Sequence, residues 1–498
     1  YENYDGICLT DTFQLNEHGD NDIFSQLFPE NSERLQKQKK APVRVIIGNP
    51  PYSVGQKNEN DNARNLAYPA LDTRIADTYA KYSSSNNKRA LYDSYIKAIR
   101  WATDRINQSK EGGIIAFMVP NTWIDGSTHE GMRKMFEMEY SSIYILDLKG
   151  NGRTSGERRH QEGDPLFAAH GGQGGSLLGA SATILVKKTE KHDTKIFYHN
   201  IGDYLKREEK LRRVKDAVSI SKIDWHAIVP NERHDWLNLR DGVFDSLVPL
   251  DPAKKFDKHS PSFFSMYSNG ISTNRDSWVY NFSTSVLETN MNRTIEFYNS
   301  QVDAFQVQYS IDSNIAVEKV VSMDETQISW SSSLLPKVSS NRKTHLDSNQ
   351  IRCASYRPFV SSHLYFGDLF IHRRGQFDYI FPHADIINLV ICVTGVGSLG
   401  FYCMITDRIA DLCFVKQGNG GDQCFPLYWY EENKNKQRSL FDEESNDDYI
   451  RRDGITDWIL KEVRTQYGTK NITKEMIFYY VYGLLHSKDY RERFAADL

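Results

Sequence analysis

Cysteine is scarce in this sequence, and several diagnostic patterns are missing. None of the six cysteines forms a Cys-x-x-Cys pair, and none has a histidine at metal-ligand spacing. We therefore expect reduced thiols, with no disulfide framework and no metal site. The sequence also lacks a phosphate-binding Gly-x-x-x-x-Gly-Lys-Ser/Thr loop and any recognisable nuclease motif. ATP-driven translocation and DNA cleavage are therefore not encoded in this sequence.

Long apolar runs and a strong charge bias are also missing. Residues 386–405 are uncharged, but they contain Asn388, Thr394, Ser398 and three glycines, which predicts two buried strands around a glycine turn and no membrane helix. A net charge of −4 excludes a uniformly basic nucleic-acid binder. Basic clusters at 37–40, 158–159, 206–215 and 373–374 are candidate local patches, with a solvated face as the alternative for each. With no signal peptide, we expect a soluble cytoplasmic protein.

The chain of 498 residues is expected to hold two or three domains, since a domain has about 150 residues. Its most informative stretch is Asn49-Pro50-Pro51-Tyr52, which follows a Val- and Ile-rich run at 43–47 and Gly48. An apolar run that ends in glycine and then two prolines predicts a buried strand that opens into a rigid loop. Open α/β sheets bind their ligands at such carboxyl ends of strands.

These four residues suit methylation of an exocyclic amine. The adenine N6 lone pair is delocalised into the ring, so it attacks a methyl group poorly unless acceptors hold the amine hydrogens. The Asn49 side-chain oxygen and the Pro50 carbonyl can be those acceptors, and the two prolines fix the loop in one conformation. Tyr52 offers a ring face on which an extruded base can stack. The competing interpretations are a purely structural turn, and methylation of RNA or of a protein glutamine through the same loop.

Alternating strand and helix patterns surround this loop. Helices are expected at 91–106 and 126–138, and strands at 114–119, 143–148, 180–187 and 196–199. This rhythm predicts an α/β fold with a parallel, doubly wound sheet that ends near residue 200. Asp11 follows an expected strand end, where it can accept a hydrogen bond from a cofactor adenine or simply form a turn.

The ordered motifs of residues 1–200 resemble those of an N6-adenine DNA methyltransferase of the gamma arrangement. The resemblance rests on Asn49-Pro50-Pro51-Tyr52, on Leu91-Tyr92 with Tyr95-Ile96, on residues 112–120 with Trp123, and on the strand at 180–187. It implies S-adenosylmethionine as the cofactor, Asn49, Pro50, Pro51 and Tyr52 as catalytic residues, and Asp11 and Pro51 as cofactor-binding residues.

The resemblance departs from the family pattern at the cofactor loop. The Gly-rich loop and its acidic ribose ligand are expected upstream of Asp11, so we expect the chain alone to bind the cofactor weakly or not at all. Residues 147–152 mimic such a loop, but no clear helix is expected after them. We interpret this mimic as a loop near DNA, with Arg153 and Arg158 meeting phosphates. Tyr198 is the candidate for a second ring on the extruded base.

The second half of the chain resembles the specificity domain of Type ISP restriction-modification enzymes. Residues 201–260 are charged and predict a helical connector with Trp225 and Trp236 as packing anchors, whereas 261–498 predict a mixed α/β domain. The resemblance rests on the motifs at 356–359, 376–382, 396–398, 405–408, 424–430 and 472–498. It implies a target-recognition domain, duplex DNA as the partner, and upstream nuclease and translocase domains in the same polypeptide.

Arginines of this half are the expected DNA contacts, namely Arg357, Arg373 and Arg374, because arginine suits guanine edges and phosphates. For most of the aromatic residues Tyr356, Phe359, Phe377 and Trp429, core packing is the preferred interpretation. We thus predict a site-specific N6-adenine DNA methyltransferase with a recognition domain. A recognition module with a vestigial catalytic fold is the alternative from another class.

Overall fold

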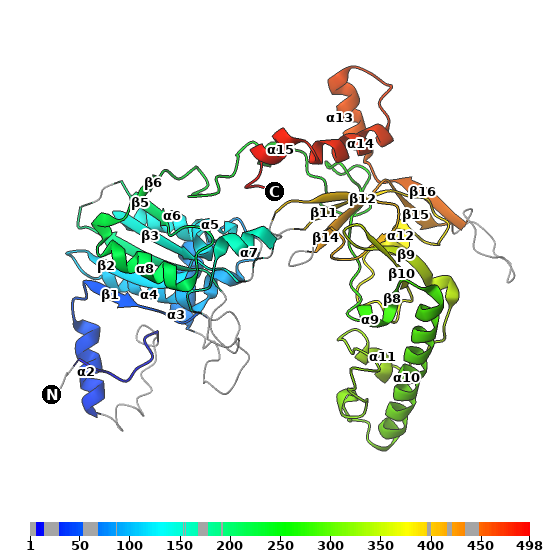
Figure 1. Cartoon of the computed structure of the whole chain (residues 1–498), viewed down its shortest axis with the longest axis horizontal. Helices are drawn as coiled ribbons and strands as arrows, with labels where there is room; N and C mark the ends of the chain where they lie inside the picture. Colours follow the sequence, from blue (N-terminus) through cyan, green and yellow to red (C-terminus); the bar gives the residue numbers. More distant parts are fainter. Residues whose placement is uncertain are drawn as a thin grey trace. The chain divides into compact units, whose positions relative to one another are not determined.

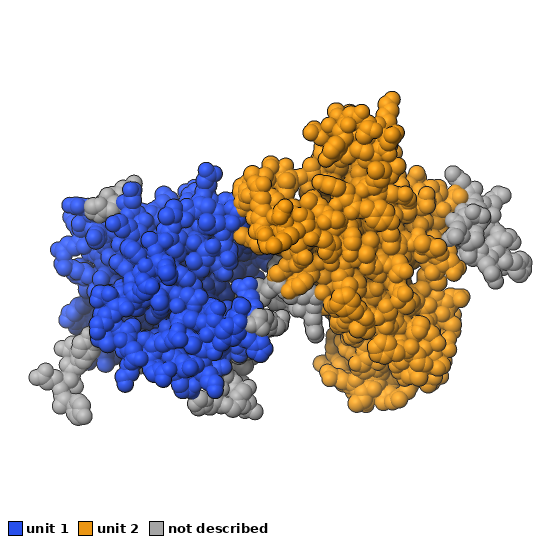
Figure 2. Space-filling model, turned by 45° about the horizontal axis from the view of Figure 1, so that its top comes forward, with its two compact units in different colours: residues 1–240 blue, residues 241–498 orange. Residues whose placement is uncertain are grey.

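The computed structural model describes residues 6–13, 29–52, 68–85, 87–152, 154, 156–167, 178–190, 193–395, 400–415, 421–433 and 448–498. The chain divides into two compact units, residues 1–240 and 241–498 (Figures 1 and 2). None of the described helices is long and apolar enough to span a bilayer. All six cysteines are free thiols, as expected.

The first unit is built on a six-stranded sheet in the order β1-β2-β4-β3-β5-β6. Its strands are β1 (Val45–Gly48), β2 (Gly113–Pro120), β3 (Ser142–Lys149), β4 (Ala180–Lys187), β5 (Lys195–Asn200) and β6 (His226–Ile228). Its helices are α2 (Pro29–Lys40), α3 (Pro69–Ile75), α4 (Ser94–Asn107), α5 (Thr122–Asp125), α6 (Glu130–Glu139), α7 (Gly156–Glu162) and α8 (Arg207–Ala217). The predicted α/β class is confirmed, and most predicted strands and helices lie within a few residues of these bounds. Two expectations are wrong: residues 6–13 contain no strand before Asp11, and β1 is not buried, because Val45 and Ile47 are exposed.

The sheet is not wholly parallel, which corrects the sequence prediction. β1, β2, β3 and β5 run parallel, whereas β4 runs antiparallel between β2 and β3, and β6 is antiparallel to β5. The first residue of β4, Ala180, lies opposite Pro120 and Lys149, the last residues of β2 and β3. The chain therefore enters β4 at the carboxyl edge of the sheet, so β4 must run back along its neighbours.

Alternating side chains of the strands build a core on each face of the sheet. Ile143 and Ile145 of β3 are buried in a cluster with α4, α6 and Trp123, whereas Leu146 and Leu148 lie in a second cluster with Leu166, Ile201 and Leu205. On the first face, buried Arg100 of α4 forms an ion pair with Glu139 of α6 at 2.9 Å. The central strands of the sheet thus have a core on each face, whereas Val45 and Ile47 of the edge strand β1 are exposed.

The second unit is a mixed α/β fold with the sheets β13-β9-β10-β8, β12-β11-β14-β7 and β15-β16. The strands are β7 (Ser268–Asn269), β8 (Tyr280–Asn281), β9 (Ile351–Arg357), β10 (Val360–Tyr365), β11 (Val390–Thr394), β12 (Cys403–Thr406), β13 (Ile409–Ala410), β14 (Asp422–Pro426), β15 (Tyr428–Glu432) and β16 (Tyr449–Asp453). The helices are α9 (Asp276–Val279), α10 (Thr284–Ile311), α11 (Leu335–Ser339), α12 (Phe377–Ile380), α13 (Asp457–Tyr467), α14 (Lys474–Leu485) and α15 (Lys488–Arg493).

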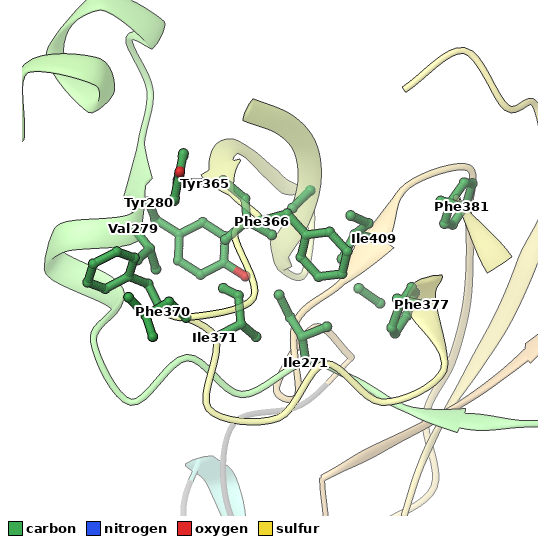
Figure 3. Packing of buried hydrophobic residues seen from close by; sticks show 14 of the residues in the cluster. Ile271, Val279, Tyr280, Tyr365, Phe366, Phe370, Ile371, Phe377, Phe381 and Ile409 are labelled. Atoms are coloured by element: carbon green, nitrogen blue, oxygen red, sulfur yellow. The ribbon is translucent and has the colours of Figure 1, made fainter. Parts of the chain in front are cut away.

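Capping and aromatic packing explain the main elements of this unit. Ser283, Thr456 and Thr473 each accept a backbone hydrogen bond at the start of α10, α13 and α14. The long helix α10 stands beside β8 and β10 (Figure 1), and the core beneath it is rich in phenylalanine (Figure 3). Within residues 386–405, β11 and β12 form the predicted pair of strands, and they are antiparallel.

Residues 201–240, predicted as part of a helical connector, lie in the first unit. α8 is the predicted helical part, but β6 extends the first sheet, and Trp236 is buried in the same cluster as Trp123. The predicted domain boundaries at residues 200 and 260 remain predictions.

Candidate functional site

The Asn49-Pro50-Pro51-Tyr52 loop begins where β1 ends, at the carboxyl edge of the first sheet. Gly48, the last residue of β1, pairs with Phe117 of β2, so the loop starts beside Met118. The Tyr52 hydroxyl lies 2.6 Å from Asn49 Oδ1 and 3.1 Å from the Met118 carbonyl oxygen. These contacts attach the end of the loop to its beginning and to the neighbouring strand.

The side chains of Asn49 and Tyr52 are both accessible to solvent. Asn49 is exposed and Tyr52 is half-buried, with its ring against the core cluster. Asn49 Oδ1 has two lone pairs, so a second donor can reach it while Tyr52 donates to the first. Burial raises the pKa of the Tyr52 hydroxyl to about 12, so the hydroxyl keeps its proton at neutral pH. The loop therefore presents a held amide oxygen beside an aromatic ring.

Asp11, predicted to bind the cofactor, is exposed and forms a turn. Its Oδ1 accepts a hydrogen bond from the Phe13 amide at 3.0 Å, and its Oδ2 accepts one from the Tyr68 hydroxyl at 2.9 Å. The Phe13 and Tyr68 rings meet edge to face at 5.2 Å. The turn interpretation thus matches the geometry. A carboxylate has further lone pairs, so a cofactor amine still finds an acceptor there, and this role stays a prediction.

A polar cleft of about 400 Å³ opens at the carboxyl ends of β2 and β3. Its central group is buried Asp147, which accepts hydrogen bonds from Asn121 Nδ2 and from the Tyr198 hydroxyl, each at 2.9 Å. Burial, followed by the neighbouring Asp147 carboxylate, raises the pKa of Tyr198. Tyr198, the predicted second ring, therefore lines this cleft with its hydroxyl fixed, and its stacking role remains a prediction.

The Gly-rich mimic at 147–152 forms one wall of this cleft. Lys149 and Gly150 both have positive φ, at 53° and 91°. The prediction that no helix follows the mimic is wrong, because α7 begins at Gly156. Arg158 of α7 is exposed at the cleft, whereas Arg153 lies outside the described residues.

Sequence reasoning did not single out Asp125, which also lines the cleft. Burial raises the pKa of its carboxyl group, and the charge of Arg158 opposes that shift. Asn238 Nδ2 donates a hydrogen bond to Asp125 Oδ2 at 3.1 Å. Since Asn238 is 113 residues away in sequence, no local pattern marks this contact.

The three arginines predicted to contact DNA in the second unit have different surroundings. Arg357 donates to Asp411 at 2.6 Å and lies 3.5 Å from Asp276. Arg374 donates to Asp378 at 2.9 Å and stacks on the Phe366 ring at 3.7 Å. Arg373 is exposed, and its guanidinium has no ion pair with the residues that the structure describes. Arg373 is therefore the arginine of these three that is best placed to reach a phosphate.

The aromatic residues of the second unit follow the core prediction with one exception. Phe377 and Trp429 are buried, and Tyr356 packs against the same cluster. Phe359 is the exception, because its side chain is 93% exposed. The exposed ring lies on the turn between β9 and β10.

Comparisons with known proteins match both units. Residues 5–152 match the model of the Eco57I restriction-modification methylase, and residues 262–498 match that of the Type ISP C-terminal specificity domain. A search of curated proteins gives no match.

Three solved structures are similar over the whole chain. The first is a nuclease-deletion mutant of the Type ISP restriction-modification enzyme LlaGI in complex with a DNA substrate mimic, with 35% identity and a TM-score of 0.70 over 100% of this chain and 36% of that one. The second is the ATP-dependent Type ISP enzyme LlaBIII bound to DNA, with 33% identity and a TM-score of 0.73 over 100% and 30%. The third is a DrdV–DNA complex, with 34% identity and a TM-score of 0.72 over 100% and 45%.

The chain thus spans between 30% and 45% of the length of these relatives. The predicted methylase module and the predicted Type ISP specificity domain are both confirmed. With a methylase module followed by a specificity module in the same order, the chain belongs to the Type ISP restriction-modification family.

Proposed function

We propose that the chain methylates adenine N6 in duplex DNA at a specific sequence, with S-adenosylmethionine as the methyl donor. The observation that carries this proposal is the exposed Asn49 amide, which Tyr52 holds at the carboxyl end of β1. Adenine enters between this amide and the Pro50 carbonyl, and both accept hydrogens of its amino group. The nitrogen lone pair then becomes available for attack, because the acceptors favour a tetrahedral nitrogen.

The cofactor, when bound, supplies an electrophilic methyl group on sulfur. Asp11 and Pro51 are the described residues on which its binding is proposed, because both are exposed. The ring of Tyr52 stacks on the extruded adenine and compensates part of the stacking lost from the duplex. The second unit supplies recognition of the sequence, as its match to a specificity domain supports. We also propose that nuclease and translocase domains act with it in one polypeptide.

The Asn49→Ala variant, made in the longer polypeptide proposed above, tests the catalytic part of this proposal. We expect a loss of at least about a hundredfold in methyl transfer to duplex DNA, because one of the two acceptors of the developing charge is removed. DNA affinity, measured by fluorescence anisotropy, should stay unchanged, since the loop acts on a base that is already extruded.

Asn107→Ala is the matched control. Asn107 ends α4 at the opposite edge of the sheet, where its side chain accepts a hydrogen bond from Lys187. This variant should transfer methyl groups at the wild-type rate. Methyl transfer by Asn49→Ala at the wild-type rate would refute the catalytic role of Asn49. Methyl transfer to RNA or protein but not to duplex DNA would refute duplex DNA as the substrate.

A further inference from the structure

The turn between β9 and β10 places an aromatic side chain in an unfavourable backbone conformation. Pro358 and Phe359 connect the two strands, and Phe359 has a φ of 63°. A proline followed by a residue of positive φ matches a type II turn, which favours glycine at that second position. For a bulky residue such a φ is an outlier, because its Cβ crowds the backbone.

In the isolated chain, phenylalanine at position 359 makes no fold-stabilising contact with the residues that the structure describes. The side chain is 93% exposed, so it contributes no core packing that would offset the backbone strain. Strained residues of this kind concentrate at sites that contact ligands. A glycine would relieve the strain, so the aromatic ring itself is the feature to explain.

The base of the hairpin is rigid. Arg357 Nη1 donates to Asp411 at 2.6 Å, and its guanidinium lies 3.9 Å from the centre of the Tyr356 ring. The Tyr356 hydroxyl donates to Asp276 at 3.0 Å. A register shift between Val360 and Ser361 marks a bulge, a device that redirects side chains. The Phe359 ring is therefore presented on a fixed support.

A cleft of about 410 Å³ lies beside the ring. Its lining includes Phe359 and Val360, the hydroxyls of Ser361 and Thr406, and Arg408. The Arg408 guanidinium donates to Ser361 Oγ at 2.7 Å and pairs with Asp407, which also lines the cleft, at 3.3 Å. Both side chains are exposed, so solvent screens this pair and a phosphate can compete for the arginine. An aromatic face beside hydroxyls and a cation is the combination that binds a nucleotide, since the ring stacks on the base and the polar groups reach its edge or phosphate.

We propose that Phe359 is a base-stacking wedge that inserts at a base step of duplex DNA. This proposal rests on the proposed function and adds a residue that opens the base stack. A protein partner fits less well, because a protein interface needs a buried apolar centre of several residues. In the hairpin of β9 and β10 only Phe359 and Val360 are exposed large apolar residues.

The test uses the full chain and a duplex selected by the wild-type chain from a random-sequence pool. Phe359→Ala should weaken binding of this duplex roughly tenfold in fluorescence anisotropy, because the ring no longer stacks on a base. The slope of log affinity against log salt should not change, since phenylalanine displaces no counterions. Phe359→Trp should bind at least as tightly as the wild type. Thymines at the wedged base step that react with permanganate in the wild-type complex should become protected with Phe359→Ala, whereas the thymine opposite the extruded adenine should stay reactive in both complexes.

Phe282→Ala is the matched control, because Phe282 is also in the second unit and is 76% exposed but has no positive φ. Its affinity and permanganate pattern should equal those of the wild type. Phe359→Gly should not lower Tm, which excludes misfolding as the cause of weaker binding. Equal binding and equal reactivity for Phe359→Ala would overturn the wedge and leave the proposed methylation intact. If Asn49→Ala loses methylation but keeps the wild-type duplex affinity and permanganate reactivity, the result would support the catalytic role of Asn49 and the wedge role of Phe359. A wild-type chain that binds no duplex would refute both.

Discussion

At the scale of single residues, the candidate site depends on the hydrogen bond between the side chains of Asn49 and Tyr52. The Tyr52 hydroxyl donates to Asn49 Oδ1 at 2.6 Å, and burial raises its pKa to about 12. The amide plane of Asn49 is thereby fixed before any base arrives. Preorganised groups of this kind stabilise a transition state without reorganising during the reaction.

Tyr52→Phe should separate the two roles of this tyrosine. The ring remains for stacking, so the KM for DNA should stay unchanged. The hydroxyl is lost, so kcat for methyl transfer should fall about three- to tenfold, since a neutral hydrogen bond contributes roughly 0.5–1.5 kcal/mol. Steady-state kinetics with a labelled methyl donor measures both values. An unchanged kcat would show that Asn49 needs no support from the hydroxyl.

The sequence predicts the identity of such residues better than their surroundings. The Asn-Pro-Pro-Tyr pattern is local, so its place at a strand end follows from the apolar run before it. The partners of Arg357 are not local, because Asp411 lies 54 residues away and Asp276 lies 81 residues away. The periodicity of apolar residues in the sequence cannot predict ion pairs between residues so far apart. The exposure of Phe359 escaped prediction for the same reason, since aromatic residues in motifs usually pack in cores.

At the scale of elements, the carboxyl edge of the first sheet collects the polar groups of the site. The strand and helix patterns predict most of these elements, because both periods follow from burying one face. The direction of β4 could not be predicted, since it depends on the edge at which the chain enters the sheet. That edge is set by the connection after β3, which carries no sequence signal for it.

Lys210 of α8 provides a pH-dependent test of this arrangement. Its buried ammonium donates to the carbonyl oxygens of Glu162 and Asp164, each at 2.9 Å, and burial lowers the pKa of Lys210 to about 8. Between pH 8 and the ordinary lysine pKa of about 10.5, Lys210 is protonated in the unfolded chain but largely deprotonated in the folded chain. The unfolded chain therefore binds more protons in this range. Stability relative to Lys210→Met should therefore rise with pH across this window, by at most about 1.4 kcal/mol per pH unit.

Thermal unfolding of both proteins between pH 7 and about 10 measures this difference. A Lys210→Arg variant is the control, because a guanidinium does not titrate in this range. A difference in Tm between wild type and Lys210→Met that is constant with pH would contradict the lowered pKa.

At the scale of the whole molecule, DNA binding cannot come from overall charge. The chain carries a net charge of −4, so attraction to phosphates requires local cations. Among the predicted arginines of the second unit, Arg373 is the one with an exposed side chain, whereas Arg374 forms an ion pair with Asp378 and stacks on Phe366. The division into two units agrees with separate modules for chemistry and recognition.

Arg373→Ala should weaken binding of duplex DNA and reduce the salt slope by about 0.9, the value for one lost phosphate contact. Arg374→Ala should leave the slope unchanged and lower Tm, because it removes an ion pair and a stacked guanidinium. Anisotropy titrations at several salt concentrations report the slopes. Equal slopes for wild type and Arg373→Ala would place the phosphate contacts elsewhere.

The most direct test identifies the methylated nucleoside. Because the chain alone is expected to bind the cofactor weakly or not at all, unmethylated duplex DNA is incubated with the longer polypeptide proposed above and S-adenosylmethionine carrying a labelled methyl group, then digested and analysed by mass spectrometry. The account predicts label on N6 of deoxyadenosine for the wild-type chain and none for Asn49→Ala. Label on cytosine instead, or equal labelling of adenine by Asn49→Ala, would contradict it.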